Sequence, residues 1–406
     1  MSFAAETVRG LPRVYWFLWV GTLINRLGNF VVPFLALYLT QERGMTLEQA
    51  GLVAALFGAG SLAAGAVGGV LADRLGRRAS MMIGLAGGGA AMLHLGFARS
   101  PFHVLIAALV LGFVGDLYRP AVWAAVADLV PREDRLRAYN LLYWAINLGF
   151  AVAAILAGLL AQNGFWLLFA GDAATSFIMA AVIFAFVPET RPKEAIRSSA
   201  FSVAAADATA PFRDGVFMSF VFLTWLVLMI FMQHTVALPL DLRNHGIDAK
   251  RFGGLIAING VLIVVLQPFV SRAVQSRRRG QMLALSALLV GLGFGLNAFF
   301  GTLGAYAFAI TVWTLGEIFM SPVAPSVVAD LAPIALRGTY QGVHQMAWGA
   351  ATCLAPAIGS TVMARGGARA LWIGCLALGA LAAAGHLAIA GPRRRSLAAL
   401  GIDARD

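Results

Sequence analysis

Five ionisable residues lie inside stretches of the chain that are otherwise apolar. They are Arg26, Asp116, Arg119, Asp172 and Glu317. An ionisable side chain near the middle of a lipid bilayer costs about 2.5–3.5 kcal/mol on insertion scales, so one without a purpose should be rare. Because two bases face three acids, we expect at least one carboxyl group to have no basic partner. Such a group favours its neutral form and can take up and release a proton.

Glu317 and Asp116 are the acids that we expect to couple to protons. Glu317 lies near the middle of an apolar stretch, has no Lys or Arg within one helical turn, and precedes Pro322, which opens the backbone hydrogen bonding locally. Asp116 occupies nearly the matching place in the other half of the chain. The alternative for Glu317 is a hydrogen-bonded role in helix packing.

Arg26 and Arg119 are the expected charge partners of these acids. Asp116 and Arg119 are three residues apart, so on a helix they share a face and can pair. That pair can also serve helix packing alone, and Arg26 can neutralise Asp116 in place of Arg119. Asp172 is expected nearer the outer face of the membrane, as an acid that reaches water.

The elements that carry these residues must be membrane-spanning helices. The 406 residues are 60% hydrophobic and only 12% charged, which excludes a soluble fold. Lipid offers no hydrogen-bond partner to a single strand, so each apolar segment of roughly 20 residues predicts a helix. The predicted helices cover 14–40, 49–72, 79–98, 102–130, 138–161, 165–187, 215–240, 252–272, 281–300, 304–331, 338–363 and 370–391. The fold class is therefore an all-α membrane protein with twelve transmembrane helices.

The loop charges predict the orientation in the membrane. Cytoplasmic loops retain Lys and Arg, and most of the 30 bases lie in loops on the side of the two termini. We therefore expect a multi-pass protein of the bacterial cytoplasmic (inner) membrane with both termini in the cytoplasm. This topology also explains the net charge of +11 without nucleic-acid binding. Cys353 and Cys375 fall in apolar segments, so we expect no disulfide and no metal site.

The chain reads as a duplicated six-helix unit. Pro120, Asp128 and Arg135 recur as Pro322, Asp330 and Arg337, each pair 202 positions apart. The longest polar stretch separates the copies, which predicts a bundle at 1–187, a cytoplasmic linker at 188–214 and a second bundle with a short basic tail at 215–406. Parallel repeats of this kind form two pseudo-symmetric bundles around a central cavity.

One loop carries a family motif. Between the second and third predicted helices the sequence reads Gly69-Val70-Leu71-Ala72-Asp73-Arg74-Leu75-Gly76-Arg77-Arg78. This stretch resembles motif A of the major facilitator superfamily, in which glycines allow close helix approach and the acid and bases form a cytoplasmic charge latch. The matching stretch of the second half, around Gln275 to Gly280, has lost the acid.

Further residues resemble bacterial twelve-helix multidrug/proton antiporters. They are Asn25-Arg26-Leu27-Gly28, Arg119-Pro120-Ala121, Gly316-Glu317 and Arg337-Gly338-Thr339-Tyr340. Gly149, Ala153-Ala154 and Ala157-Gly158 keep the spacing of the antiporter motif of the fifth helix with several residues replaced. Small-residue packing alone explains that pattern equally well.

The resemblance and the repeat together predict two sets of site residues. The expected cytoplasmic gate or latch comprises Gly69, Asp73, Arg74, Gly76, Arg77, Asp128, Arg135, Asp330 and Arg337, with Asp128 facing Arg135 and Asp330 facing Arg337. The expected substrate cavity includes Tyr143, Asn147, Gln233, Asn259 and Trp313, which are polar or amphipathic at membrane depth. Each of these five can instead form a hydrogen bond between helices.

The expected function is secondary transport rather than catalysis. The resemblance implies proton-coupled efflux of amphipathic, cationic compounds, by a monomer with protons and a small molecule as its partners and no cofactor. The alternative is a carrier for a defined small solute such as a sugar, organic acid or peptide, or for a lipid. A cavity dense in Asn, Gln and Arg would favour the defined solute, and an aromatic and aliphatic cavity with acids would favour drugs.

Overall fold

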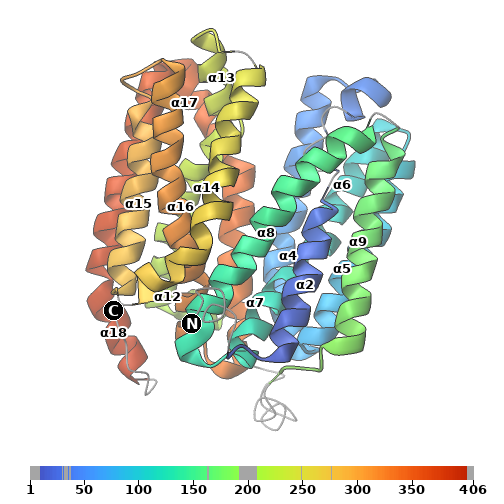
Figure 1. The fold of residues 1–406 in the computed structure, drawn as a ribbon, viewed down its shortest axis with the longest axis vertical. Coiled ribbons are helices and arrows are strands. Elements are labelled where there is room, and N and C mark those ends of the chain that lie inside the picture. Colours follow the sequence, from blue (N-terminus) through green and yellow to red (C-terminus); the bar gives the residue numbers. More distant parts are fainter. Residues whose placement is uncertain are drawn as a thin grey trace. The chain divides into compact units, whose positions relative to one another are not determined.

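The computed structural model describes residues 10–29, 31, 35, 38–161, 164–191, 208–247, 249–275 and 277–399. Within these ranges the chain is helical and contains no strand. Figure 1 shows the helices as long, roughly parallel rods within each part of the chain. Nine segments of the described residues are long and apolar enough to cross a membrane. The prediction of an all-α membrane protein is therefore confirmed.

Contacts between Cα atoms divide the chain into two compact units. Unit 1 comprises residues up to Ala210 together with Ala332–Gly349, and unit 2 comprises Pro211–Leu331 and the residues from Ala350 onward. The helices of unit 1 that precede the division are α2 (Arg13–Leu27), η1 (Tyr38–Glu42), α4 (Leu47–Arg74), α5 (Arg77–Phe97), α6 (Pro101–Asp116), α7 (Tyr118–Leu129), α8 (Arg132–Ala161) and α9 (Trp166–Phe186). The predicted linker and bundle boundaries stay a prediction, and residues 192–207 of that linker lie outside the described part.

The second half of the chain is also helical. Its elements are α11 (Ala210–Arg213), α12 (Gly215–Phe231), η3 (Met232–His234), α13 (Ala237–Asn244), α14 (Ala249–Gln275), α15 (Arg279–Leu296), α16 (Leu303–Leu331), η4 (Ile334–Leu336), α17 (Arg337–Ala388) and α18 (Ala390–Ala399). The long α17 contains a non-helical break at Gly367, whose φ of +79° suits glycine. This break falls between the predicted helices 338–363 and 370–391.

Every one of the twelve predicted segments coincides with at least one helix among the described residues. The predicted helix 102–130 is α6 followed by α7, which are separated only by Leu117. Local signals account for several helix starts, because Thr46 and Gln49 form a capping box at α4 and Asp214 accepts a hydrogen bond from the Phe217 amide at α12. The count of twelve membrane crossings is consistent with this arrangement and stays a prediction.

Packing within each unit places the candidate site residues. In unit 1, α4 packs against α6, α5 packs against α9 and α6, and α2 packs against α8 and α9. In unit 2, α16 packs against α15 and α14, and α12 packs against α15. Glycines permit the closest of these contacts, since a Cβ at Gly112 would stand 2.1 Å from the Phe57 carbonyl oxygen of α4. Small residues at helix interfaces are typical of membrane bundles.

Candidate functional site

The loop between α4 and α5 makes a sharp turn at Gly76. Its φ of +104° lies in the region that side chains rarely adopt. A Cβ added at this residue would stand 2.2 Å from the Glu189 carboxylate. Two independent constraints therefore require glycine here, and the turn brings the end of α4 and the start of α5 together.

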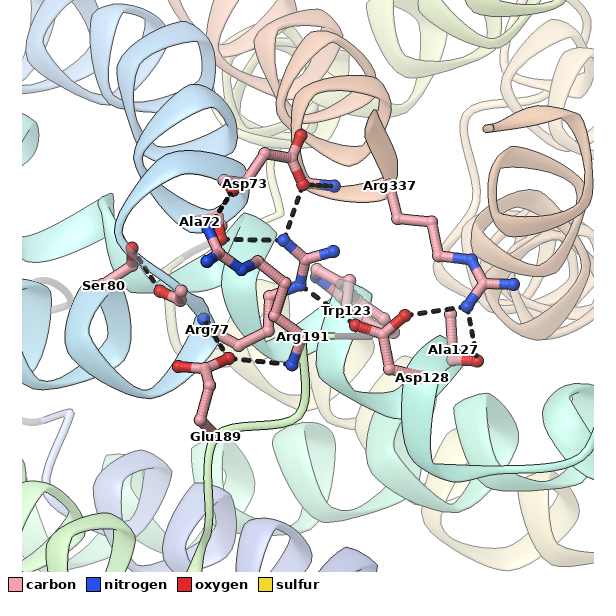
Figure 2. A network of polar contacts seen from close by, with 12 residues as sticks. Ala72, Asp73, Arg77, Ser80, Trp123, Ala127, Asp128, Glu189, Arg191 and Arg337 are labelled. Carbon is pink, nitrogen blue, oxygen red and sulfur yellow. Dashed lines mark hydrogen bonds and ion pairs between the residues drawn. The ribbon is translucent and has the colours of Figure 1, made fainter. Parts of the chain in front are cut away.

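Arg77 is the centre of a buried charge cluster in unit 1. Its side chain is fully buried, and its Nη1 donates to Asp73 Oδ1 at 2.6 Å and to the Ala72 carbonyl at 2.7 Å. Its Nε donates to Asp128 Oδ2 at 3.0 Å. Figure 2 shows both carboxylates directed toward this one guanidinium. A buried arginine is stable only when it is paired and hydrogen-bonded, and two acids meet that need.

Asp73 also binds the first turn of α17. Its Oδ1 accepts the Gly338 amide at 2.8 Å, and its Oδ2 accepts both the amide and the hydroxyl of Thr339 at 2.6 Å. The first amides of a helix have no partner inside the helix and carry partial positive charge, so a carboxylate is a fitting acceptor. The acid of the sequence motif therefore caps a helix that begins more than 260 residues later in the chain.

Arg337 completes the cluster. Its Nη1 donates to Asp128 Oδ1 at 2.7 Å and to the Ala127 carbonyl at 3.3 Å. The prediction that Asp128 faces Arg135 is wrong, because Asp128 binds Arg77 and Arg337. The predicted pairing of Asp330 with Arg337 stays a prediction. Asp128 and Arg135 are separated along the sequence by the same number of residues as Asp330 and Arg337. This repeated spacing does not by itself show which side chains are in contact. Arg135 is buried, and its Nε donates to the Val130 carbonyl.

A glycine seam brings α4 and the start of α17 to backbone contact. A Cβ at Gly69 would stand 2.5 Å from the Gly338 carbonyl oxygen, and a Cβ at Gly342 would stand 2.3 Å from that of Gly65. The glycine of the motif therefore permits the approach that lets Asp73 reach α17. Arg74, which was predicted to belong to the latch, has an exposed side chain, and its carbonyl accepts a hydrogen bond from Arg191.

The segment after α9 binds backbone groups of the loop between α4 and α5. Glu189 accepts the backbone amides of Arg77 at 2.9 Å and Arg78 at 3.2 Å, and so caps α5. Arg191 donates to the carbonyls of Asp73 and Arg74, which lie at the end of α4. Figure 2 shows Glu189 on the side of Arg77 away from Arg337. The sequence analysis assigned this segment only to a linker and missed both roles.

Unit 2 contains the repeat equivalent of one ion pair. Arg279 donates to Asp330, whose side chain is almost fully buried. Arg279 and Asp330 lie 202 positions after Arg77 and Asp128. Both residues of the Arg77 and Asp128 pair therefore recur at the repeat offset. This joint recurrence is the sequence signal that could have identified Arg77 as a partner of Asp128 and Arg279 as a partner of Asp330.

Glu317 lies inside unit 2 near the middle of α16. Its side chain is buried, and its Oε2 accepts a hydrogen bond from Asn259 Nδ2 of α14 at 2.8 Å. Asn259 also donates to Thr314 Oγ1 at 3.1 Å, so the amide holds two neighbouring turns of α16. Gly316 and Ser286 fix α15 beside it, because Ser286 Oγ donates to the Gly316 carbonyl at 2.7 Å.

The ionisable residues of unit 1 lie together. Asp116 pairs with Arg119 at 2.8 Å, as the three-residue spacing predicted. Arg26 does not replace Arg119 in this pair, because its Nη2 donates to Tyr118 Oη at 2.9 Å. Asp172 is 7% exposed, so the prediction of an acid that reaches water at the surface is wrong. It faces the interior between α2, α5 and α9.

The five predicted cavity residues make contacts within their own units. On α8, Asn147 donates to the Tyr143 carbonyl. In unit 2, buried Gln233 donates to the Ala355 carbonyl of α17, and Trp313 stacks against Phe294. The contacts of Gln233 and Trp313 match the alternative of hydrogen bonding and packing between helices, whereas the Asn147 bond lies within α8 and Asn259 binds Glu317. Their role in a substrate cavity stays a prediction.

Comparison with known proteins adds independent observations. A sequence profile described as "Major Facilitator Superfamily" matches residues 18–356 and again residues 235–402. A Bacillus subtilis (strain 168) protein named "Uncharacterized MFS-type transporter YttB" is 28% identical over 375 residues, which cover 91% of this chain and 93% of that protein.

Two further relatives have named activities. The "Na(+), Li(+), K(+)/H(+) antiporter" of Planococcus maritimus is 25% identical over 357 residues, 80% of this chain and 84% of that protein. The "Multidrug resistance protein MdtH" of Escherichia coli O9:H4 (strain HS) is 24% identical over 340 residues, 82% of each.

Solved structures share the fold at low identity. The human organic anion transporter MFSD10 has a TM-score of 0.76 at 18% identity, over 92% of this chain and 99% of that chain. The proton:xylose symporter XylE has a TM-score of 0.73 at 17% identity, over 91% of this chain and 94% of that chain. Because the family profile matches most of the sequence, the chain belongs to the Major Facilitator Superfamily of membrane transporters, as the loop motif predicted.

Proposed function

We propose that this protein is a proton-coupled antiporter that exports amphipathic, cationic compounds across the bacterial cytoplasmic membrane. The observation that carries the proposal is the buried Glu317 carboxyl, which a neutral amide holds in the middle of an apolar helix. The named activities of two relatives, a cation/proton antiporter and a multidrug resistance protein, agree with this chemistry.

Glu317 has the surroundings that reversible protonation requires. The hydrogen bond from Asn259 Nδ2 to Glu317 Oε2 can form with either the charged or the neutral carboxyl, so the side chain keeps its position when a proton leaves. Ionisation of a buried carboxyl is costly unless a cation approaches. A cationic substrate and a proton therefore compete for the same negative charge.

The charge cluster around Arg77 supplies the gate of the proposed cycle. Asp73 holds the first turn of α17 through three hydrogen bonds, and Asp128 holds Arg337. Hydrogen bonds to charged groups contribute about 1.5–3 kcal/mol each. Breaking these bonds to the first turn of α17 therefore costs enough free energy to separate two conformational states of a transporter. The same bonds can form again when the turn returns to Asp73.

One observation favours the rival, a carrier for a defined small solute. A cavity of about 140 Å³ within unit 1 is lined by Asn25, Asn29, Arg26 and Arg119 as well as by acids. A surface of this kind suits a hydrogen-bonding solute better than an apolar drug. The named xylose symporter has the same fold, but at 17% identity this likeness carries only the fold.

The test is ethidium transport in proteoliposomes under an imposed pH gradient. We expect ethidium to accumulate in vesicles with an acidic lumen, in exchange for protons, and to stop when the gradient is dissipated. Glu317→Gln should abolish this accumulation while the protein remains folded. Asp134→Asn is the matched control, since Asp134 pairs with Arg137 near the start of α8, away from the proposed site.

Two results would contradict the proposal. Ethidium accumulation that does not depend on the gradient would remove the coupling. Undiminished coupling in the Glu317→Gln variant would remove the assigned residue. Saturable exchange of a sugar or organic acid, with no response to ethidium, would establish the rival function.

A further inference from the structure

A small polar cavity lies inside unit 1, between α2, α5, α6, α7 and α9. Its volume is about 140 Å³, and its polar lining includes Asn25, Arg26, Asp116, Tyr118, Asp172 and Ser176. This volume is sufficient for several water molecules, each of which needs two to four polar partners. The lining offers such partners on α2, α7 and α9, so the cavity can hold water next to its acids.

Hydrogen bonds organise most of this lining into a chain. Arg26 Nη2 donates to Tyr118 Oη at 2.9 Å, and Tyr118 Oη donates to Asn25 Oδ1 at 3.1 Å. Asn25 Nδ2 then donates to Ser176 Oγ at 3.0 Å. Ser176 lies one turn after Asp172 on α9, so the chain ends next to that acid.

Asp172 is the exception in this arrangement. The backbone amide of Val31 binds its carboxyl group, but its Oδ2 is buried and has no hydrogen-bond partner among the described residues. Asp116, by contrast, has Arg119 at 2.8 Å. A buried carboxylate oxygen that has no donor would carry a large desolvation cost if it were charged. The geometry therefore fits the neutral, protonated acid.

The charged and titratable groups around Asp172 come from three helices. Arg26 of α2 interacts with it electrostatically, and Arg26 Nε has no hydrogen-bond partner within the described chain. Asp116 of α6 and Tyr118 and Arg119 of α7 line the same cavity. The cavity-lining residues of α5 are Gly84, Leu85, Gly88 and Met92, and the described residues of α8 contribute none to the lining.

We propose that Asp172 is a proton-binding site of unit 1, separate from Glu317 in unit 2. In the release step the O–H bond of the Asp172 carboxyl breaks, the proton passes to a water molecule in the cavity, and the carboxylate keeps the electron pair. Arg26 then supplies the compensating charge through its Nε, which has no partner while Asp172 is neutral. This proposal deepens the proposed antiport by adding a second proton site, and it assigns Asp116 to the ion pair with Arg119.

The test measures protonation directly and needs no substrate. Infrared difference spectra of the purified full-length protein in detergent detect the C=O stretch of a protonated carboxyl group. We expect the wild-type protein to have a band from Asp172 that disappears at alkaline pH and is absent from Asp172→Asn, in addition to a band from Glu317. Asp116→Asn should retain the Asp172 band, because Asp116 pairs with Arg119 and is not the group assigned to this band. Asp172→Glu should retain a titrating band at a shifted frequency, which keeps the test decisive if Asp172→Asn fails to fold.

The outcomes separate this proposal from the proposed function. Glu317→Gln should remove a different band, and its failure to do so would count against Glu317 without affecting Asp172. A spectrum that is unchanged in Asp172→Asn, an unshifted band in Asp172→Glu, or loss of the band in Asp116→Asn would overturn the Asp172 site.

Discussion

The two ion pairs related by the repeat, Arg77 with Asp128 and Arg279 with Asp330, differ in the further groups that they bind. In unit 1, Arg77 binds Asp128 and also Asp73, which in turn caps the first turn of α17. In unit 2, Arg279 binds Asp330. The residue that follows Asp73 by 202 positions is Gln275, so the capping acid exists in only one copy.

This difference separates a structural function from a gating function. An arginine and aspartate pair present in both copies can fix helix packing in each six-helix repeat. Asp73 and Asp128 both bind the start of α17, a helix from a distant part of the sequence, whereas Arg279 and Asp330 belong to one repeat. We therefore propose that the shared pairs serve helix packing, and that Asp73, together with the contact between Asp128 and Arg337, captures α17 reversibly.

The largest expected effect comes from removing the central arginine. Arg77→Ala leaves two buried carboxylates without their shared base, which should lower the free energy of unfolding by about 3–5 kcal/mol. Arg279→Ala is the matched variant and should cost less, since the Arg279 side chain is 20% exposed whereas that of Arg77 is fully buried and binds two acids. Thermal unfolding in detergent measures both. Equal losses would remove the distinction between the two units.

Asp128→Asn should change transport rates more than substrate choice. Asp128 binds both Arg77 and Arg337, so its neutralisation weakens two pairs and should destabilise the captured state by about 2 kcal/mol. Asp330→Asn should alter rates less. The measurement is the initial rate of ethidium exchange for each variant, with competing cations to rank preference. A changed ranking with an unchanged rate would contradict the gating role.

Thr339→Val tests the capture of α17 alone. It removes one hydroxyl bond to Asp73 and keeps the shape of the side chain, with an expected cost of about 1 kcal/mol. Thr339→Ser should restore the bond and the wild-type stability. Hydrogen exchange of the amides at Gly338 and Thr339 reports the release of this turn. Faster exchange in the valine variant and not in the serine variant is the expected result.

The smallest expected effect concerns the support from outside the cluster. Glu189→Ala removes the acceptor for the first amides of α5, and loss of a helix cap costs about 1 kcal/mol or less. Glu189→Gln should recover part of this loss, since its carbonyl oxygen can accept one amide. Thermal unfolding is again the readout. A loss as large as that of Arg77→Ala would place Glu189 at the centre of the cluster rather than at its edge.

The sequence predicted the helices well because apolar length is a local signal. It also predicted the Asp116 and Arg119 pair, since residues three apart on a helix must be neighbours. The partners of Asp128 could not be found from short spacing, because Arg77 and Arg337 come from other helices. The repeat offset indicates one of these two partners, Arg77, because it relates Arg77 to Arg279 as it relates Asp128 to Asp330.

Burial was the least predictable property of the site. Asp172 was expected nearer the outer face of the membrane, and the packing of α2, α5 and α9 buries it beside an internal cavity instead. Glu189 and Arg191 lie in a polar segment whose composition indicates a linker and gives no sign of the backbone groups that they bind. Such side chain to backbone bonds depend on where a turn such as Gly76 places its amides, which periodicity does not reveal.

The most direct test of the central claim is the release of protons when a cation binds to the purified protein. Ethidium is added to weakly buffered wild-type protein in detergent while a pH indicator follows the solution, with Asp134→Asn as the folded control. If substrate and proton compete for Glu317, the wild-type and control proteins should acidify the solution and Glu317→Gln should not. Equal proton release from Glu317→Gln and the wild-type protein would contradict the account.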